Sequence, residues 1–161
     1  MHWITRERPK IDRVACPWLI SRFIDPAAAF HFVQSDRVLE QARALGATPF
    51  DVEGVELSHS GPLCTFDALL AKYELKDPAL LEIATIVRGA DTARLDRAPQ
   101  AAGLLALSLG LSHLFQDDYV QLAHGMVLYD ALYAWARYAR SETHSWNPQR
   151  GPLVTPVAGN G

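Results

Sequence analysis

The sequence of 161 residues lacks several features that define common protein classes. Its only two cysteines, Cys16 and Cys64, are too few for a disulfide scaffold. The longest nearly apolar run, Ala101 to Leu111, has 11 residues and is too short to span a bilayer. The net charge is −3, so the chain has no basic field of the kind that binds duplex nucleic acid. Any binding of anions must therefore be local.

The sequence also lacks the short motifs that mark several large enzyme classes. There is no G-x-S-x-G nucleophile motif, no phosphate-binding glycine loop and no G-x-G-x-x-G fingerprint. The first ten residues, MHWITRERPK, contain no apolar core of a secretory leader. We therefore expect a cytoplasmic protein with reduced thiols and no membrane partner. Its 49% hydrophobic and 20% charged residues are ordinary for a globular domain.

The first third of the chain predicts a small α/β layer. Strand patterns occur at residues 2–5 (HWIT), 29–33 (AFHFV) and 48–59 (TPFDVEGVELSH). A helical apolar face begins at Ile11, and Pro17 should kink that helix or form its first turn. A second helix is expected between Ser35 as its N-cap and Gly46 as its stop.

The remainder of the chain predicts helices. They are expected after Thr65 as an N-cap, from Asp77-Pro78 to Gly89, over residues 100–113 as a buried helix, and from Asp117 to Arg140 with Gly125 weakening its middle. The predicted fold class is thus mixed α+β: a small N-terminal α/β layer followed by a mainly helical part. One compact domain should cover residues 1–146, and residues 147–161 should form a flexible tail rich in Pro and Gly.

A basic stretch near the amino terminus predicts an anion site. Its four cations lie within eight residues: Arg6, Arg8, Lys10 and Arg13. If residues 3–8 are extended, Arg6 and Arg8 point to the same side, and Arg13 lies near the start of the next helix. Helix N-termini and forked guanidinium donors suit a tetrahedral oxyanion such as sulfate, phosphate or chromate. In the alternative interpretation, Glu7 and Asp12 pair with these cations on a solvated surface.

Cys16 is the candidate for a reactive thiol. A nearby arginine and a helix start would favour its thiolate, which is the nucleophilic form. However, Cys16 also flanks the apolar face that starts at Ile11, which predicts a buried and inert cysteine.

Three residues are candidate metal ligands. On a strand, Glu56 and His59 point to opposite sides, so His59 alone remains a candidate from the segment ELSHS. Asp91 follows a glycine and could cap the next turn or bind a metal. His124 lies in line with apolar residues of the longest helix, where a hydrogen-bonded core histidine is the alternative. A site that combined His59, Asp91 and His124 would suit a borderline divalent metal.

Six stretches together resemble one family over about residues 2 to 146. They are WITRERPKIDRVACPWLISRFIDP, PFDVEGVELSHSG, CTFDALLAKYEL, IVRGADT, APQAAGLLALSLGLS and HGMVLYDALYAWAR. They are similar to the C-terminal chromate-resistance domain of the chromate-resistance protein B family. That family is associated with a chromate efflux transporter, and its longer members, which have an additional N-terminal half, with chromate-responsive regulation. This chain starts at HWITRERPK, so we expect that half and DNA binding to be absent.

The resemblance implies an accessory or sensor protein in chromate resistance. Its partner would be a small oxyanion such as chromate, held by the basic stretch with Arg88 as a further candidate. His59, Asp91 and His124 would form a polar pocket or hold a divalent metal cofactor. Two alternatives remain: a thiol- or metal-dependent reductase that uses Cys16, and an interaction domain without a ligand. The sequence leaves open whether the protein is catalytic, which metal it holds and whether it forms a homo-oligomer.

Overall fold

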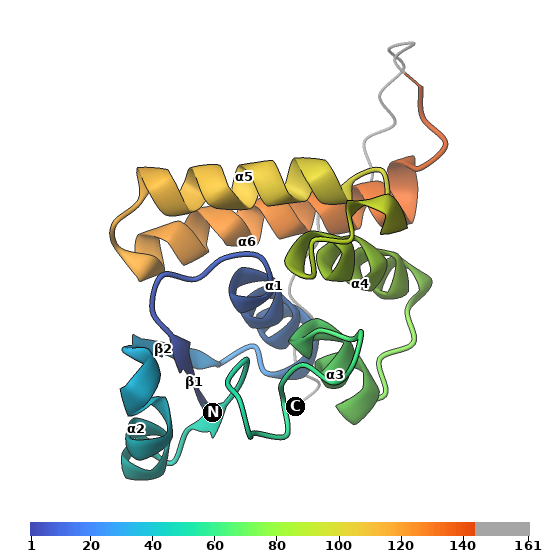
Figure 1. The fold of residues 1–161 in the computed structure, drawn as a ribbon. Helices are drawn as coiled ribbons and strands as arrows, with labels where there is room; N and C mark the ends of the chain where they lie inside the picture. Colours follow the sequence, from blue (N-terminus) through green and yellow to red (C-terminus); the bar gives the residue numbers. More distant parts are fainter. Residues whose placement is uncertain (144–161) are drawn as a thin grey trace.

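Six α-helices and three short strands make up the part of the chain that the computed structural model describes, residues 1–143 (Figure 1). The strands are β1 (His2–Arg6), β2 (Ala29–Val33) and β3 (Thr48–Pro49). The α-helices are α1 (Asp12–Leu19), α2 (Val38–Leu45), α3 (Thr65–Lys72), α4 (Pro78–Asp91), α5 (Ala101–Leu114) and α6 (Asp118–Ala134). Shorter 3₁₀ or π-helical turns are Ile20–Ile24, Ser35–Arg37, Leu95–Arg97 and Trp135–Ala139. The predicted α+β class is confirmed, while the tail predicted at residues 147–161 lies outside the described residues.

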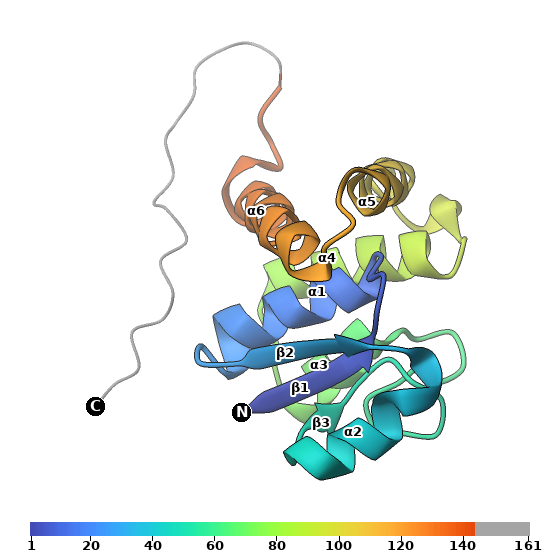
Figure 2. The same ribbon diagram turned by 90° about the vertical axis from the view of Figure 1, so that its left-hand side faces the viewer.

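The three strands form a parallel sheet in the order β2–β1–β3. Side chains along the central strand alternate between two cores, as the pleat of a strand requires. Trp3 enters the main core, whereas Ile4 packs with Val38 and Ala42 of α2. Figure 2 shows α2 on the side of the sheet opposite α1.

The main core lies between the sheet and the helices. Trp18 of α1 is fully buried, stacks against Phe66 of α3 and contacts Tyr129 of α6. Where α1 and α6 cross, Gly125 faces Val14 so closely that a Cβ at position 125 would clash with the valine. The glycine expected to weaken this helix is therefore what lets the two helices approach.

The structure corrects two predicted helix boundaries, the end of α4 and the N-cap of α3. Helix α4 continues through Gly89 to Asp91, and a Cβ at position 89 would lie 3.0 Å from that of Ala101. Gly89 thus serves close packing and does not stop the helix. Helix α3 is capped by Cys64, whose N–H donates to Asp67 at 3.0 Å, so the predicted cap at Thr65 is one residue late.

Three further details of the prediction also differ. Pro17 lies inside α1, which begins at Asp12, so the helix does not start at the proline. The third strand is shorter than its pattern and continues only as an isolated bridge between Phe50 and Leu57. The helix expected to be buried, α5, lies on the surface, where Leu107 is 55% exposed. None of the described helices combines the length and the apolar character needed to cross a membrane.

Candidate functional site: a carboxylate cluster around a histidine

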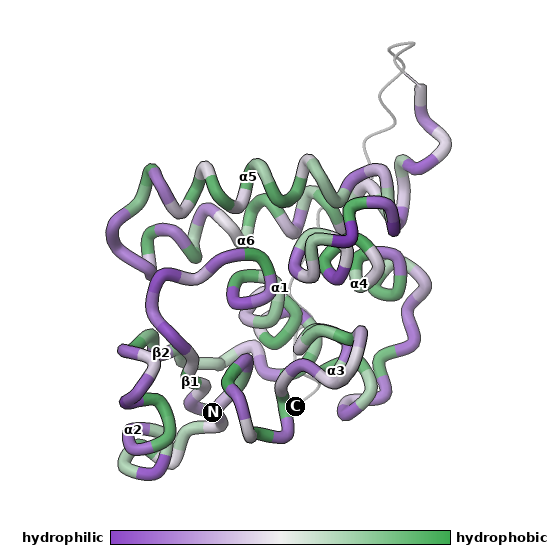
Figure 3. Tube along the Cα trace, viewed as in Figure 1, coloured by the Kyte–Doolittle hydropathy of each residue, from purple (hydrophilic) through white to green (hydrophobic). Residues whose placement is uncertain are grey.

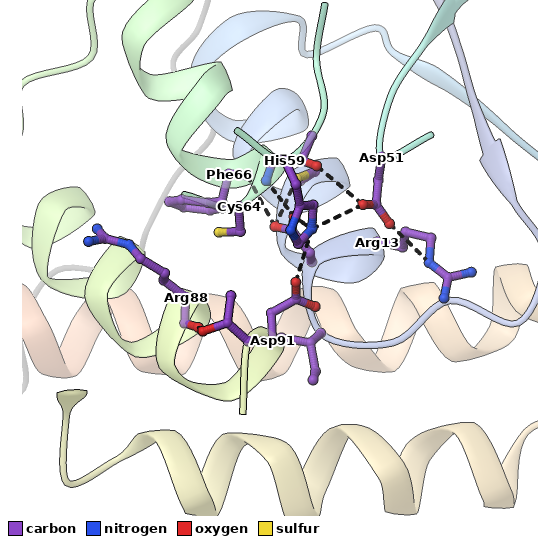
Figure 4. A network of polar contacts seen from close by, with 12 residues as sticks. Arg13, Asp51, His59, Cys64, Phe66, Arg88 and Asp91 are labelled. Carbon is purple, nitrogen blue, oxygen red and sulfur yellow. Dashed lines mark hydrogen bonds and ion pairs between the residues drawn. The ribbon is translucent and has the colours of Figure 1, made fainter. Parts of the chain in front are cut away.

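Three carboxylates surround the imidazole of His59 (Figure 4). Its Nε2 lies 3.1 Å from Asp91 Oδ2, 3.4 Å from Asp51 Oδ1 and 3.6 Å from Asp12 Oδ2. Asp12 begins α1, Asp91 ends α4, and Asp51 and His59 belong to the long loop between β3 and α3. The His59 side chain is 41% exposed whereas the acids are largely buried, so the cluster opens to solvent at the histidine.

Asp12 is the most deeply buried member, at 1% exposure. Its carboxylate accepts hydrogen bonds from the backbone N–H groups of Thr65 (2.7 Å) and Phe66 (3.1 Å), at the start of α3, and from the Cys16 thiol (3.3 Å). The N-terminus of a helix stabilises a negative charge. Burial opposes this, and together with the charges of the two neighbouring acids it raises the pKa of Asp12 to about 7. This carboxyl group therefore changes its protonation near neutral pH.

Asp51 joins the cluster to two of the amino-terminal cations. Its Oδ2 lies 3.1 Å from a terminal nitrogen of Arg6 and 3.2 Å from Nε of Arg13. Asp51 adopts a left-handed backbone conformation with φ of 51°, held by its N–H bond to the Leu57 carbonyl at 2.8 Å. Burial and the nearby charge of Arg6 lower the pKa of Arg13. An open pocket lined by Arg6 and by loop residues between 51 and 59 lies beside these groups.

The donor atoms lie close enough together for one divalent cation to contact several of them. Metal bonds of about 2.0–2.2 Å to nitrogen and oxygen keep adjacent ligand atoms about 2.9–3.6 Å apart in octahedral or tetrahedral geometry. The three distances from His59 Nε2 to carboxylate oxygens fall in this range. Asp12, His59 and Asp91 each offer a ligand atom, and these atoms lie within 4.8 Å of one another. Imidazole and carboxylate together suit a borderline metal such as zinc, iron or manganese.

The pKa of Asp91 is also raised by its surroundings. Burial raises its pKa, and the charge of Asp51 acts in the same direction, while His59 opposes the shift. A cation placed among these acids would reverse the effect, because it stabilises their charged forms.

The four cations of the basic stretch separate in the structure. Arg6 and Arg13 meet beside the cluster, as described. Arg8 points instead to the end of α5 and the turn that follows it, where its guanidinium donates to the Ser112 carbonyl at 3.1 Å and to Gln116 Oε1 at 2.9 Å. Strand β1 ends at Arg6 and Arg8 has a positive φ of 55°, so the alternation that would align the two side chains does not apply. Lys10 is exposed.

Two other predicted site residues also lie away from the cluster. Arg88 forms a forked ion pair with Asp67, at 3.0 and 2.9 Å, and points away from the cluster in Figure 4. His124 is exposed and stacks on Phe115 with 4.4 Å between ring centroids. Two of the three predicted metal ligands are therefore brought together, and His124 is not among them.

The surroundings of both cysteines disfavour reactive thiolates. Cys16 is fully buried and its thiol donates a hydrogen bond to Asp12, and burial with the nearby negative charge raises the pKa of Cys16 well above the ordinary value. Burial likewise raises the pKa of Cys64. Both groups are thus neutral thiols at physiological pH.

Sequence reasoning missed two members of the cluster. The sequence offers Asp12 only as an alternative surface partner of the neighbouring cations, and Asp51 lies in a strand-like segment that gives no sign of a site. The one local signal for Asp12 is its place at the first turn of a helix that is apolar from Val14 onward. For Asp51 the pattern gives no comparable signal.

The described residues form a small α+β domain. Its main polar feature is a partly buried cluster of carboxylate and imidazole groups, which are side chains of the types that bind metal ions. The chain matches the family model described as "ChrB, C-terminal domain" over residues 3–136, a range that includes the whole cluster. The chain belongs to this family, and the resemblance of its sequence motifs is thereby confirmed.

A curated relative supports the same conclusion. Protein ChrB of Cupriavidus metallidurans is 34% identical to this chain over 132 residues. The match covers 81% of this chain but 39% of that protein, so the chain spans well under half of the relative's length. No solved structure matches the chain.

Proposed function

We propose that this domain is the ligand-binding part of a chromate-resistance sensor or accessory protein. It binds a divalent metal ion through Asp12, His59 and Asp91, and it holds an oxyanion of the chromate type beside the metal with Arg6 and Arg13. Membership of the ChrB C-terminal family supports the role in chromate resistance. The observation that carries the ligand assignment is the convergence of three carboxylates on one imidazole nitrogen.

The charge balance indicates the order of binding. Without a metal, the carboxylates of Asp12, Asp51 and Asp91 outweigh the guanidiniums of Arg6 and Arg13 when all are ionised. A dianion would then meet a net negative site. A divalent cation reverses that balance, so the metal binds first and the oxyanion second.

Arg6 and Arg13 supply the donors for the oxyanion. Both guanidiniums lie on one carboxylate oxygen of Asp51, so they already converge on a single negatively charged group. Nε of Arg6 has no hydrogen-bond partner among the described residues. Forked donors of this kind match the oxygens of a tetrahedral anion.

The thiol-dependent version of the reductase alternative lacks a supporting observation. The thiol that it would use, Cys16, is buried and its raised pKa keeps it protonated. A sensor binds its ligand stoichiometrically without turnover, whereas a reductase would consume chromate in the presence of a cellular reductant.

Elemental analysis of protein purified without chelators tests the metal assignment. We expect about one divalent ion per chain in the wild type. The bound metal should fall by at least about tenfold in His59→Ala, because each residue that binds the metal directly contributes strongly to its affinity. His124→Ala is the matched control, since this exposed histidine lies outside the cluster. A metal-free wild type, or equal metal content in both variants, would contradict the proposal.

Calorimetric titration with sulfate, a redox-inert analogue of chromate, tests the anion assignment. Arg6→Gln should weaken binding by about 10- to 100-fold, the effect of removing one charged hydrogen-bond donor. Lys10→Gln, which removes an exposed cation of the same stretch, should leave the affinity unchanged. Chelation of the metal should abolish anion binding, and anion binding that survives it would refute the order of events.

A further inference from the structure

Asp51 stands between the candidate metal site and the two arginines that would hold an oxyanion. Its Oδ1 lies 3.4 Å from Nε2 of His59, while its Oδ2 lies 3.1 Å from Arg6 and 3.2 Å from Arg13. Figure 4 shows Asp51 between His59 and Arg13, with a contact to each of them. One carboxylate is thus shared between the two halves of the site.

The contact with Asp51 occupies both guanidiniums without satisfying them. A single carboxylate oxygen, Oδ2, pairs with Arg6 and with Arg13. Nε of Arg6 is buried and has no hydrogen-bond partner among the described residues. A tetrahedral anion has four oxygens where Asp51 offers one, so it would accept hydrogen bonds from more of these donors.

The guanidiniums are also more accessible than the acid that they share. The side chains of Arg6 and Arg13 are 39% and 18% exposed, against 7% for Asp51. A terminal nitrogen of Arg13 donates to the Glu7 carbonyl at 2.9 Å, so the position of this side chain does not depend on Asp51 alone. Figure 3 colours most of the segment that carries both arginines as hydrophilic. An anion that arrives from solvent therefore meets the donors before it meets the carboxylate.

We propose that Asp51 is an internal competitor of the oxyanion: in the metal-free domain its carboxylate takes the place of the anion on Arg6 and Arg13, and a bound metal relieves this competition. The inference rests on the proposed function, in which a divalent metal binds the cluster around His59. A cation in that cluster lies beside Oδ1 of Asp51 and attracts its negative charge. The hold of Oδ2 on the arginines then weakens, and the anion replaces it.

Asp51 has other contacts that do not involve the arginines. Its Oδ1 accepts a hydrogen bond from the Thr65 hydroxyl at 3.2 Å, and its N–H donates to the Leu57 carbonyl at 2.8 Å. The acid therefore remains held in its loop when the anion takes over the guanidiniums. The alternative is a purely structural ion pair, whose loss would lower the stability of the fold without creating anion binding.

Calorimetric titration of sulfate into chelator-treated protein, at constant ionic strength, tests the proposal. Asp51→Asn should bind sulfate at least ~10-fold more tightly than the metal-free wild type, because its loss of charge leaves two carboxylates facing two guanidiniums. Glu53→Gln is the matched control. It removes the same charge at an exposed position of the same loop, which lines the same pocket, and should leave the affinity unchanged.

Asp51→Gly provides a second variant that suits the local backbone. The φ of Asp51 is 51°, a left-handed value that glycine adopts without strain, so the loop can keep its conformation without the side chain. This variant should show the same gain in affinity as Asp51→Asn. Adding Arg6→Gln to Asp51→Asn should remove the gain, because the anion then loses one of its donors.

The same titration with saturating Zn²⁺ tests the relief by metal. The difference between wild type and Asp51→Asn should narrow, since the cation weakens the competing contact in the wild type. An unchanged difference in protein that holds zinc by elemental analysis would overturn this part of the proposal.

The comparison among chelator-treated proteins separates this proposal from the metal assignment. A wild type that holds no metal would contradict the proposed function and leave the effect of Asp51 readable. The competition itself is overturned if neither Asp51 variant binds sulfate more tightly than the metal-free wild type. It is equally overturned if Glu53→Gln gains as much affinity, or if the gain survives the loss of Arg6.

Discussion

The buried carboxyl group of Asp12 makes the stability of the metal-free protein depend on pH in a direction unusual for an acid. Its pKa lies near 7 in the folded protein, against an ordinary value of 3.8. Between these two values the folded state binds a proton that the unfolded state has released. Stability therefore falls as the pH rises from about 4 to about 7, and it levels off above that.

The size of this effect follows from the two pKa values. Over the whole interval, a difference of about three units corresponds to ~4 kcal/mol at about 1.4 kcal/mol per unit. Between pH 5 and pH 8, where the unfolded carboxyl group is already ionised, the folded group loses its proton and stability falls by about 2.5 kcal/mol.

Asp12→Asn removes this titration, and urea denaturation in the presence of a chelator measures it. The asparagine keeps one acceptor for the N–H groups at the start of α3 but leaves the other poorly paired, which costs about 1–3 kcal/mol at every pH. We expect the stability advantage of the wild type over this variant to shrink by about 2.5 kcal/mol between pH 5 and pH 8. Asp96→Asn, at an exposed acid outside the cluster, should show no such trend.

A constant difference between wild type and Asp12→Asn across this pH range would refute the reasoning. It would mean that Asp12 keeps one protonation state throughout, and the crowding of the three acids would then not control the site. With a saturating metal ion the trend should reverse, because the cation binds the deprotonated carboxylate.

Three further predictions concern the packing of α1 against α6, the Arg88–Asp67 ion pair and the two thiols. Gly125→Ala should lose about 1–3 kcal/mol in urea denaturation, despite the higher helix propensity of alanine, because the added Cβ meets α1; unchanged stability would mean that the helices are not in such close contact. Arg88→Met should lose about 2 kcal/mol because it removes the ion pair of Asp67 and leaves that carboxylate only the hydrogen bonds from Cys64. Adding Asp67→Asn should recover part of this loss, and the double variant should still bind sulfate. Cys16 and Cys64 should not react with a thiol reagent until the protein is unfolded, and rapid labelling of the native protein would contradict their burial.

Much of the fold follows from local signals in the sequence. The strand predicted at residues 29–33 is β2, and the Asp77-Pro78 pair starts α4 with the aspartate accepting from the Ala79 N–H. Both signals act within a few residues, so they need no knowledge of the tertiary structure. Gly89 misled the prediction for the opposite reason, because its value lies in contact with a helix that comes later in the chain.

The candidate site was predictable only in part, because its members are separated by long stretches of sequence. Residue type alone pointed to His59 and Asp91, since imidazole and carboxylate are common ligands. Nothing local indicated that the loop after β3 would fold back onto the start of α1. In the sequence the neighbouring arginines are the obvious partners for Asp12, whereas the structure pairs it with the amide groups of α3.

Helix α5 shows how a failed prediction can point to an interaction. A helix that is apolar on all sides is normally buried, and this rule placed α5 in the core. The structure instead leaves one side of α5 open to solvent. The neighbouring helices α4 and α6 both begin with the expected aspartate N-caps. Places where consistent local rules fail tend to be functional surfaces. The basic segment connects the α5–α6 hairpin to the candidate site, since Arg13 contacts Asp51 while Arg8 donates to Ser112 at the end of α5 and to Gln116 in the turn that follows.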